Sequence, residues 1–238
     1  MIRIFDNLWL ASGPNLTHPW DANAYLVNGE EPTMIDCGSS KGYAALKDGL
    51  RALGLRPQDI RRVLATHGHW DHLSGMRQLA EEGGAELWIH AAERAPVETG
   101  DQELTASFLY GEDFPVLSVD SLLKDGQRFC INGWSVTVVH TPGHSPGSVC
   151  FLLEKARFRL LVAGDTLWAH GHPRIGSDVR AWQHSLDRLL ELDFDLVTTG
   201  HMAATLLLDA KRRIQEARMQ LGTYYYPWFK PFHYHFRY

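Results

Sequence analysis

Three histidines and an aspartate lie within six residues of each other, at His67, His69, Asp71 and His72, directly after the predicted strand 61–65. Imidazole nitrogens and carboxylate oxygens are the ligands that zinc, iron and manganese use in proteins. Because His67 and His69 are one residue apart, both rings can converge on one ion from a loop. The pattern H-x-H-x-D-H therefore predicts a metal site, with enough ligands nearby for a second ion.

Three further candidate ligands follow apolar segments in the same way. His144 lies in a turn that contains a proline and a glycine, and Asp165 and His201 each come directly after a glycine at the end of a predicted strand. A glycine before a ligand lets the backbone turn sharply and bring the side chain inward. The candidate ligand set therefore grows to seven residues.

The elements that must position these ligands alternate between strands and helices. Apolar runs and alternating patterns predict strands at 24–27, 33–35, 61–65, 86–89, 127–131, 134–139, 148–153, 159–162 and 196–198. Apolar residues at three- and four-residue spacing predict helices at 40–53, 73–80, 91–97, 181–192 and 203–221, with one more helix in 100–115. The pairs Asn28-Gly29 and Asn132-Gly133 predict hairpins, so the strands should form two sheets.

Composition indicates one ordinary globular catalytic domain, which we place at 1–222, followed by an aromatic C-terminal tail at 223–238. The chain has 238 residues, of which 45% are hydrophobic and 21% charged, and its net charge of -5 gives no reason to expect a nucleic acid partner. Neither an export signal nor an apolar run of about 20 residues is visible, so we expect no membrane association. Three widely spaced cysteines favour a reduced, cytoplasmic setting, with each thiol packed as a small buried group.

The candidate ligands stand in motifs that resemble those of a known family. The motifs are His67-Gly68-His69-Trp70-Asp71-His72, Thr141-Pro142-Gly143-His144-Ser145, Gly164-Asp165-Thr166 and Thr199-Gly200-His201, with the turn Ile35-Asp36-Cys37-Gly38. They resemble the metallo-β-lactamase fold hydrolases, most closely the glyoxalase II-like branch, over residues 24–201. The resemblance implies an α/β fold, a four-layer αβ/βα sandwich with metals in the cleft between two sheets.

The resemblance also implies a role for each ligand and a cofactor of two divalent ions, zinc first, with iron or manganese as alternatives. It assigns one ion to His67, His69 and His144, the other to Asp71, His72 and His201, and the bridging position to Asp165. A water between the ions would become the attacking hydroxide, with Asp71 and Asp165 as the catalytic carboxylates. Asp36 is expected to accept a hydrogen bond from one of the ligand imidazoles.

The implied activity is hydrolysis of an ester, a lactone of the acyl-homoserine lactone type, or a thioester. His69 departs from flavodiiron-type sites, which have an acid there, and Asp165 departs from a major class of true β-lactamases, which have a cysteine. The C-terminal pattern that glyoxalase II uses for glutathione is not found after His201. Three alternatives remain open: a persulfide dioxygenase with one iron, a phosphodiesterase, and a catalytically weak binding protein on the same fold.

Substrate contacts are expected from two segments near the ligands. The loop 167–174 follows Asp165 and contributes Trp168, His170, His172 and Arg174, although a structural ion pair is an equal alternative for Arg174. The aromatic tail, beginning with Tyr224, is expected to cover apolar surface on its own domain or on a second subunit of a homodimer, or to line the pocket for a small-molecule substrate.

Overall fold

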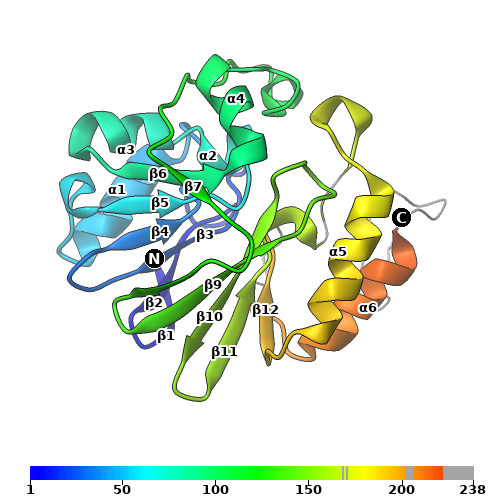
Figure 1. Cartoon of the computed structure of the whole chain (residues 1–238). Helices are drawn as coiled ribbons and strands as arrows, with labels where there is room; N and C mark the ends of the chain where they lie inside the picture. The colour runs from blue at the N-terminus through cyan, green and yellow to red at the C-terminus, as the bar shows by residue number, and fades with distance from the viewer. Residues whose placement is uncertain (168, 170, 202–205, 222–238) are drawn as a thin grey trace, which may run out of the picture.

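Two β-sheets face each other and are flanked by helices in the computed structural model, which describes residues 1–167, 169, 171–201 and 206–221 (Figure 1). The strands are β1 (Ile2–Phe5), β2 (Leu8–Ser12), β3 (Ala24–Val27), β4 (Thr33–Ile35), β5 (Arg62–Leu64), β6 (Glu86–His90), β7 (Ser121–Leu123), β8 (Arg128–Ile131), β9 (Trp134–His140), β10 (Val149–Lys155), β11 (Phe158–Val162) and β12 (Leu196–Thr198). The α-helices are α1 (Tyr43–Ala52), α2 (Trp70–Leu73), α3 (Met76–Gly83), α4 (Ala91–Thr99), α5 (Val179–Glu191) and α6 (Ala210–Gln220). Short 3₁₀ turns are η1 (Pro57–Asp59), η2 (Ser107–Leu109), η3 (Gly164–Thr166) and η4 (Pro173–Ile175).

The first sheet contains seven strands in sequence order, β1 to β7. Strands β1 to β4 are antiparallel, and β4 to β7 are parallel, with Met34 opposite Val63 and Val63 opposite Leu87. The parallel strands therefore end at one edge of the sheet, and the segment that starts at Thr66 leaves from this edge. Chemistry-bearing loops are well placed at such strand ends.

The second sheet contains five strands in the order β12-β11-β10-β9-β8. Strands β8 to β11 are antiparallel, and β12 is parallel to β11, with Leu161 opposite Val197. The two predicted hairpins meet between the halves of the chain, because the Asn132 side chain donates hydrogen bonds to the carbonyls of Val27 and Glu31. These bonds tie the turn ends of the two sheets together.

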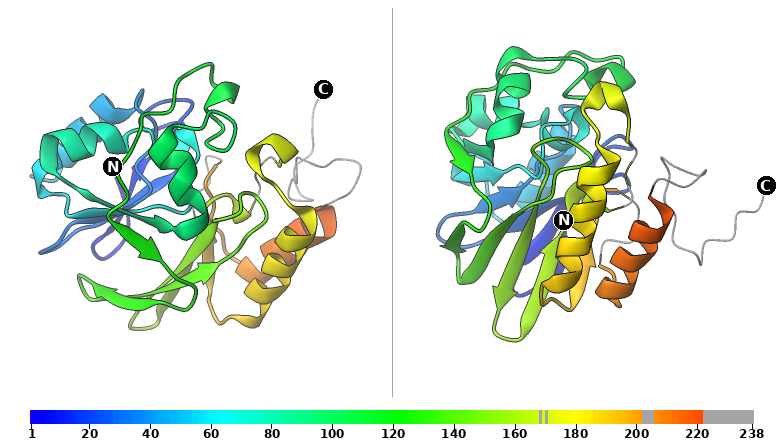
Figure 2. Two further views of the ribbon diagram at one scale, coloured as in Figure 1. Left: turned by 45° about the horizontal axis from the view of Figure 1, so that its top comes forward. Right: turned by 45° about the vertical axis from the view of Figure 1, so that its right-hand side comes forward.

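Three apolar cores explain the layering of the molecule. One core lies between the sheets and includes Tyr25 and Leu64 from the first sheet and Trp134 and Phe151 from the second, each almost fully buried. A second core joins the first sheet to α1, α2 and α3, and a third joins the second sheet to α5 and α6. Figure 2 shows these helices outside the two sheets. The α/β fold, a four-layer αβ/βα sandwich, is therefore confirmed.

Several predicted elements differ from those observed. Strands β1, β2 and β7 were not predicted. β1 and β7 have only four and three residues, too few for a clear alternating pattern, and β2 is a nearly continuous apolar run that does not alternate. The helix predicted at 73–80 is two helices, because the amide of Gly75 donates to the carbonyl of Gly38 and so leaves the helical ladder. Within 100–115 only η2 forms, because Ala106 adopts a left-handed conformation with φ of 57°.

The last helix begins later than predicted. Within the described residues α6 starts at Ala210, because Asp209 has φ of 57° and Leu207 pairs with Val197 as an isolated bridge. A left-handed residue cannot continue a right-handed helix. The expectation for residues 203–205 and for the aromatic tail lies outside the described part of the chain.

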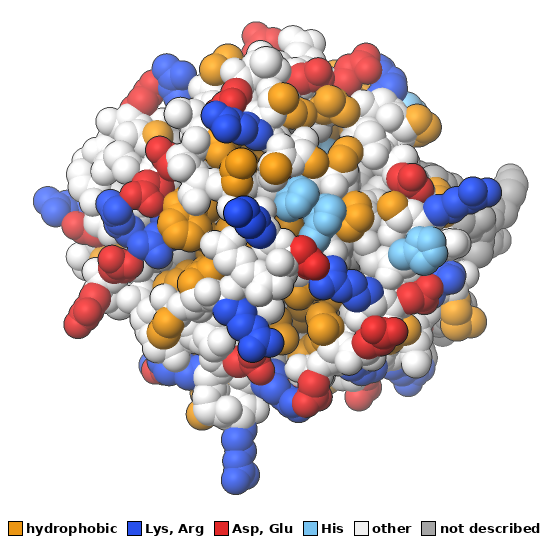
Figure 3. All heavy atoms as spheres, viewed as in Figure 1, with side chains coloured by type: hydrophobic (Ala, Val, Ile, Leu, Met, Phe, Trp, Pro, Cys, Tyr) orange, Lys and Arg blue, Asp and Glu red, His pale blue; other side chains and the backbone are white. Residues whose placement is uncertain are grey.

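The prediction that each cysteine is buried had a mixed outcome. Cys37 and Cys150 are buried as expected, but Cys130 is exposed on the short strand β8, so the prediction of burial was wrong there. Lys and Arg side chains alternate with Asp and Glu on the face shown in Figure 3. None of the helices in the described ranges is long and apolar enough to cross a membrane.

Candidate metal centre

The first four candidate ligands lie in the segment that leaves β5. His67 and His69 belong to the loop, and Asp71 and His72 lie on α2, the single turn that follows. The carbonyl of Asp71 accepts a hydrogen bond from Ala22, and the amide of Trp70 donates one to Thr105. These backbone contacts fix the short helix, which could not be stable alone.

The other three ligands come from the second sheet. His144 follows β9, Asp165 lies in η3 after β11, and His201 follows β12. A Cβ on Gly200 would lie 2.0 Å from Asp165 Oδ1, so the residue before His201 must be glycine for these two ligands to approach each other. The glycine therefore serves a close contact, in addition to the sharp turn that was predicted.

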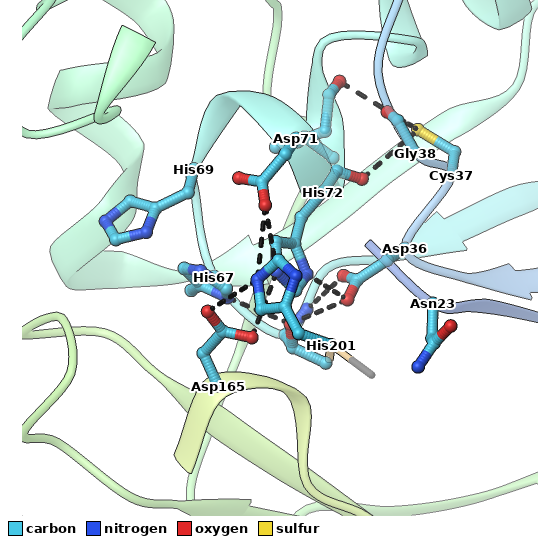
Figure 4. A network of polar contacts seen from close by, with 12 residues as sticks. Asn23, Asp36, Cys37, Gly38, His67, His69, Asp71, His72, Asp165 and His201 are labelled. Carbon is cyan, nitrogen blue, oxygen red and sulfur yellow. Dashed lines mark hydrogen bonds and ion pairs between the residues drawn. The ribbon is translucent and has the colours of Figure 1, made fainter. Parts of the chain in front are cut away.

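The structure brings all seven candidate ligands together in three groups of three, linked by His67 and His72, which each belong to two groups. Figure 4 labels these ligands except His144. We call His67, His69 and His144 the first site, and Asp71, His72 and His201 the second site. Within each group the ligand atoms lie within 4.8 Å of one another. Except for His201, which is about one-third exposed, these side chains are almost completely buried.

Asp165 lies between the two groups. Its Oδ2 is 3.4 Å from His144 Nε2 of the first site and 3.1 Å from His201 Nε2 of the second, and its Oδ1 is 3.1 Å from His72 Nε2. Such a position is the one that the bridging role requires, since the carboxylate reaches both groups at once.

Asp36 supports two of the ligands from behind. Its carboxylate accepts hydrogen bonds from His72 Nδ1 at 2.8 Å and from the amide and hydroxyl of Thr66, both at 2.7 Å. The Thr66 hydroxyl also contacts His67 Nδ1 at 3.0 Å. The expected carboxylate-to-imidazole contact is therefore present, and it turns Nε2 of each ring toward the cluster.

The nitrogen and oxygen atoms of the candidate ligands are arranged as a bound cation would require. His69 Nδ1 and His144 Nε2 lie 2.9 Å apart, and among the described residues the buried Nε2 of His67 has no hydrogen-bond partner. Lone pairs that converge in this way would be costly to bury without a positive charge among them. A divalent ion bound by imidazole and carboxylate would satisfy them.

Burial and neighbouring charges shift the pKa values of imidazoles in the two sites in opposite directions. Burial, together with adjacent imidazoles, lowers the pKa of His67 and His69 well below the usual value. Burial also opposes protonation of His72 and His201, but Asp165 and Asp71 raise the pKa of both. In the metal-free protein His67 and His69 therefore favour the neutral form, whereas His72 and His201 favour the protonated form.

Five of the candidate ligands line a cavity of about 470 Å³, a size typical of small-molecule sites. They are His69, Asp71, His144, Asp165 and His201. Two segments supply its apolar walls: Ala106, Leu109 and Tyr110 from the loop after α4, and Ala169 and Ile175 from the loop after Asp165. The cavity therefore combines polar ligand groups with apolar side walls.

The predicted substrate residues have different outcomes. The loop after Asp165 lines the cavity through Ala169, but His172 and Arg174 are not among the lining residues. Arg174 forms an ion pair with Glu103 at 2.9 Å and lies over the ring of Phe108, which is the structural alternative. Trp168, His170 and Tyr224 lie outside the described residues.

Sequence reasoning missed two residues near the ligands. Tyr110 lines the cavity, and its phenol is hydrogen-bonded to Asp71, with a pKa raised by burial and by that carboxylate. Nothing in the irregular segment around it signals this position. Glu93 is buried on α4 and contacts two ligand loops, and an acid on the buried face of that helix was a usable signal.

Comparison with known proteins gives consistent matches. Residues 18–201 match the family model of the metallo-beta-lactamase superfamily. The probable metallo-hydrolase YqgX of Bacillus subtilis is 29% identical over 80% of this chain and 89% of its own length. The acyl-coenzyme A thioesterase MBLAC2 of Gallus gallus is 30% identical over a matched segment that covers 62% of this chain and 58% of that protein. The solved structure of the Rm3 metallo-beta-lactamase has a TM-score of 0.76 at 20% identity, covering 92% of this chain and 90% of that one, and so shares the fold.

Proposed function

Because this chain belongs to the metallo-beta-lactamase superfamily, we propose that it is a dinuclear hydrolase that cleaves an ester, a lactone or a thioester. Family membership and similarity to named metallo-hydrolases make the chain a metal-dependent hydrolase. The observation that carries the finer proposal is the position of Asp165, whose two oxygens reach imidazoles of both sites. A carboxylate that could be shared by two ions is typical of dinuclear metallohydrolases.

The proposed ligands are those of the first and second sites, with Asp165 shared between them. When bound, two divalent ions would supply a nucleophile from water near neutral pH and would polarise the carbonyl of the substrate. The donor set suits zinc and also accepts iron or manganese. Asp36 would keep the ring of His72 in the tautomer whose Nε2 is free to bind.

Residues of the chain would place the substrate and move its protons. Asp71 lines the cavity and is placed to orient the attacking water, while the Tyr110 hydroxyl lies beside it as a hydrogen-bond donor. By donating to Asp71, this phenol would hold the carboxylate in place and favour its ionised form. The apolar walls would hold the acyl part of the substrate and exclude water from the reacting carbonyl.

The choice among the three bonds rests on the cavity and on the named relatives. An apolar wall beside a polarised carbonyl suits acyl-homoserine lactones and acyl thioesters, and similarity to the Gallus gallus acyl-coenzyme A thioesterase supports thioesters. Membership of the glyoxalase II-like branch, a cytoplasmic setting, a homodimer formed through the tail and the absence of nucleic acid partners stay predictions.

Metal analysis combined with a matched substrate panel tests the proposal. The panel offers one acyl group as a p-nitrophenyl ester, a homoserine lactone and a coenzyme A thioester, with bis(p-nitrophenyl) phosphate as the phosphodiester. We expect two ions per chain and turnover of one or more carbonyl substrates. One iron per chain with oxygen uptake on a glutathione persulfide would instead establish the dioxygenase. Turnover of the phosphodiester alone, or no turnover with both ions bound, would also overturn the proposal.

A further inference from the structure

Glu93 is a buried carboxylate that joins two loops from opposite halves of the chain. It lies on α4 and is only 1% exposed. Its Oε2 accepts a hydrogen bond from the amide of Gly68 at 3.1 Å, while Oε1 accepts from the amide of Gly147 at 2.6 Å and from the hydroxyl of Ser145 at 2.8 Å. One side chain therefore bonds to a loop of the first sheet and a loop of the second.

Both of these loops carry ligands of the first site. Gly68 separates His67 from His69, and Ser145 directly follows His144. The His69 and His144 rings meet at a ring-nitrogen distance of 2.9 Å, although their residues are 75 positions apart in the chain. The separation of the two loops must therefore be set accurately, and Glu93 contacts each loop next to its ligand.

The packing around Glu93 leaves no room for the loops to move closer. A Cβ on Gly68 would lie 2.9 Å from Glu93 Oε2, and a Cβ on Gly147 would lie 2.5 Å from Glu93 Cγ. Each loop therefore rests directly on the glutamate side chain. All three groups that bond to the carboxylate are donors, so an acceptor with two oxygens is required at this position.

We propose that Glu93 is a positioning residue for the first site, where it sets the distance between the His67–His69 loop and His144. This inference rests on the ligand assignment of the proposed function. A glutamine at this position keeps the size of the side chain but presents one acceptor oxygen and one amide group. In either orientation the amide group faces a donor of one ligand loop, so that loop must shift.

Zinc affinity measured one site at a time tests the role of Glu93. In an H201A background the first site alone keeps its three histidines, and in an H69A background the second site alone keeps its ligands. We expect Glu93→Gln to weaken zinc binding about 10- to 100-fold in the first background, as for other residues that support a ligand, and less than about twofold in the second. Competition with a chromophoric chelator gives the affinities, and the visible spectrum of bound Co²⁺ reports the first-site geometry.

Glu98→Gln is the matched control, because Glu98 lies on the same helix and accepts a hydrogen bond from the exposed Arg94. It should leave both affinities unchanged. Equal affinity of the E93Q and parent proteins in the H201A background would overturn the inference, and so would an equal loss in both backgrounds, which would indicate general destabilisation. If E93Q does not fold, Ser145→Ala removes a single donor and should weaken the first site alone; unchanged affinity there would also overturn it.

The outcome for Glu93 is separable from that of the proposed function. If the unaltered protein binds only one ion, the dinuclear assignment fails, but the comparison in the H201A background still decides whether Glu93 positions the three histidines. If the unaltered protein binds two ions and E93Q behaves as its parent does, the inference about Glu93 alone fails.

Discussion

Replacing Asp36 by asparagine should weaken the second site while leaving its ligands in the sequence. The carboxylate accepts three hydrogen bonds, from the amide and hydroxyl of Thr66 and from Nδ1 of His72. Asparagine is the same size but has a single acceptor oxygen. If its oxygen faces the Thr66 amide, its amide group meets His72 Nδ1 and favours the tautomer in which Nε2 carries the proton. If it is turned round, two donors meet at Thr66.

The magnitude follows from one unsatisfied buried donor. Leaving such a group without its partner costs about 1–3 kcal/mol. Since about 1.4 kcal/mol corresponds to a factor of ten in an equilibrium constant, zinc affinity at the second site should fall about 5- to 150-fold. This range includes the loss of about 10- to 100-fold that is usual for residues supporting a metal ligand. The first site should weaken less, because Asp36 reaches His67 only through Thr66.

Zinc competition with a chelator measures this change, and long-range ¹H–¹⁵N NMR spectra of the imidazoles report the tautomer of His72. Asp59→Asn is the control, since Asp59 pairs with Arg56 on the surface, away from the ligands. Asp36→Asn with both zinc affinities unchanged and Nδ1 of His72 still protonated would refute the reasoning. An equal loss in D36N and D59N would show that the effect is not specific to the site.

Three further perturbations have defined outcomes. Asp165→Ala removes the one carboxylate that reaches both sites, so hydrolysis and zinc content measured by mass spectrometry should both fall; full occupancy with a normal rate would exclude a bridging role. Zinc affinity of the second site should rise with pH through the neutral range, because its imidazoles have raised pKa values and must lose protons to bind, whereas the first-site histidines with lowered pKa values are already neutral. Calorimetry in buffers of different ionisation enthalpy counts the released protons, and equal release from both sites would contradict this assignment. Tyr110→Phe should lower kcat/KM about tenfold with zinc content unchanged, since it removes a donor next to Asp71; a rate equal to that of the unaltered enzyme would mean that the phenol only forms part of the wall.

The clustering of the seven candidate ligands could be predicted from the sequence because each segment that carries them follows a strand. Strands β5, β9, β11 and β12 have strong apolar patterns. His144 follows the end of β9, Asp165 the end of β11 and His201 the end of β12, each within four residues. The sheets and most helices were predictable for the same reason. Local pattern and tertiary position agree in these segments.

The wall of the cavity could not be predicted, because it depends on irregular chain. Tyr110 reaches Asp71 from a segment whose path is set by the left-handed Ala106, and alanine gives no signal for that conformation. Asp209 ends the extended segment before α6 in the same way. In both cases tertiary contacts decide the backbone conformation against the ordinary preference of the residue.

Each site takes its ligands from both halves of the chain, and this has a consequence for biogenesis. During synthesis the loop with His67 and His69 leaves the ribosome first, but the three-histidine group is incomplete until His144 follows, and the second group is incomplete until His201 does. Domains fold as units once enough of the chain has emerged. A nascent chain therefore presents only partial sets of the candidate ligands until His144 and then His201 have emerged.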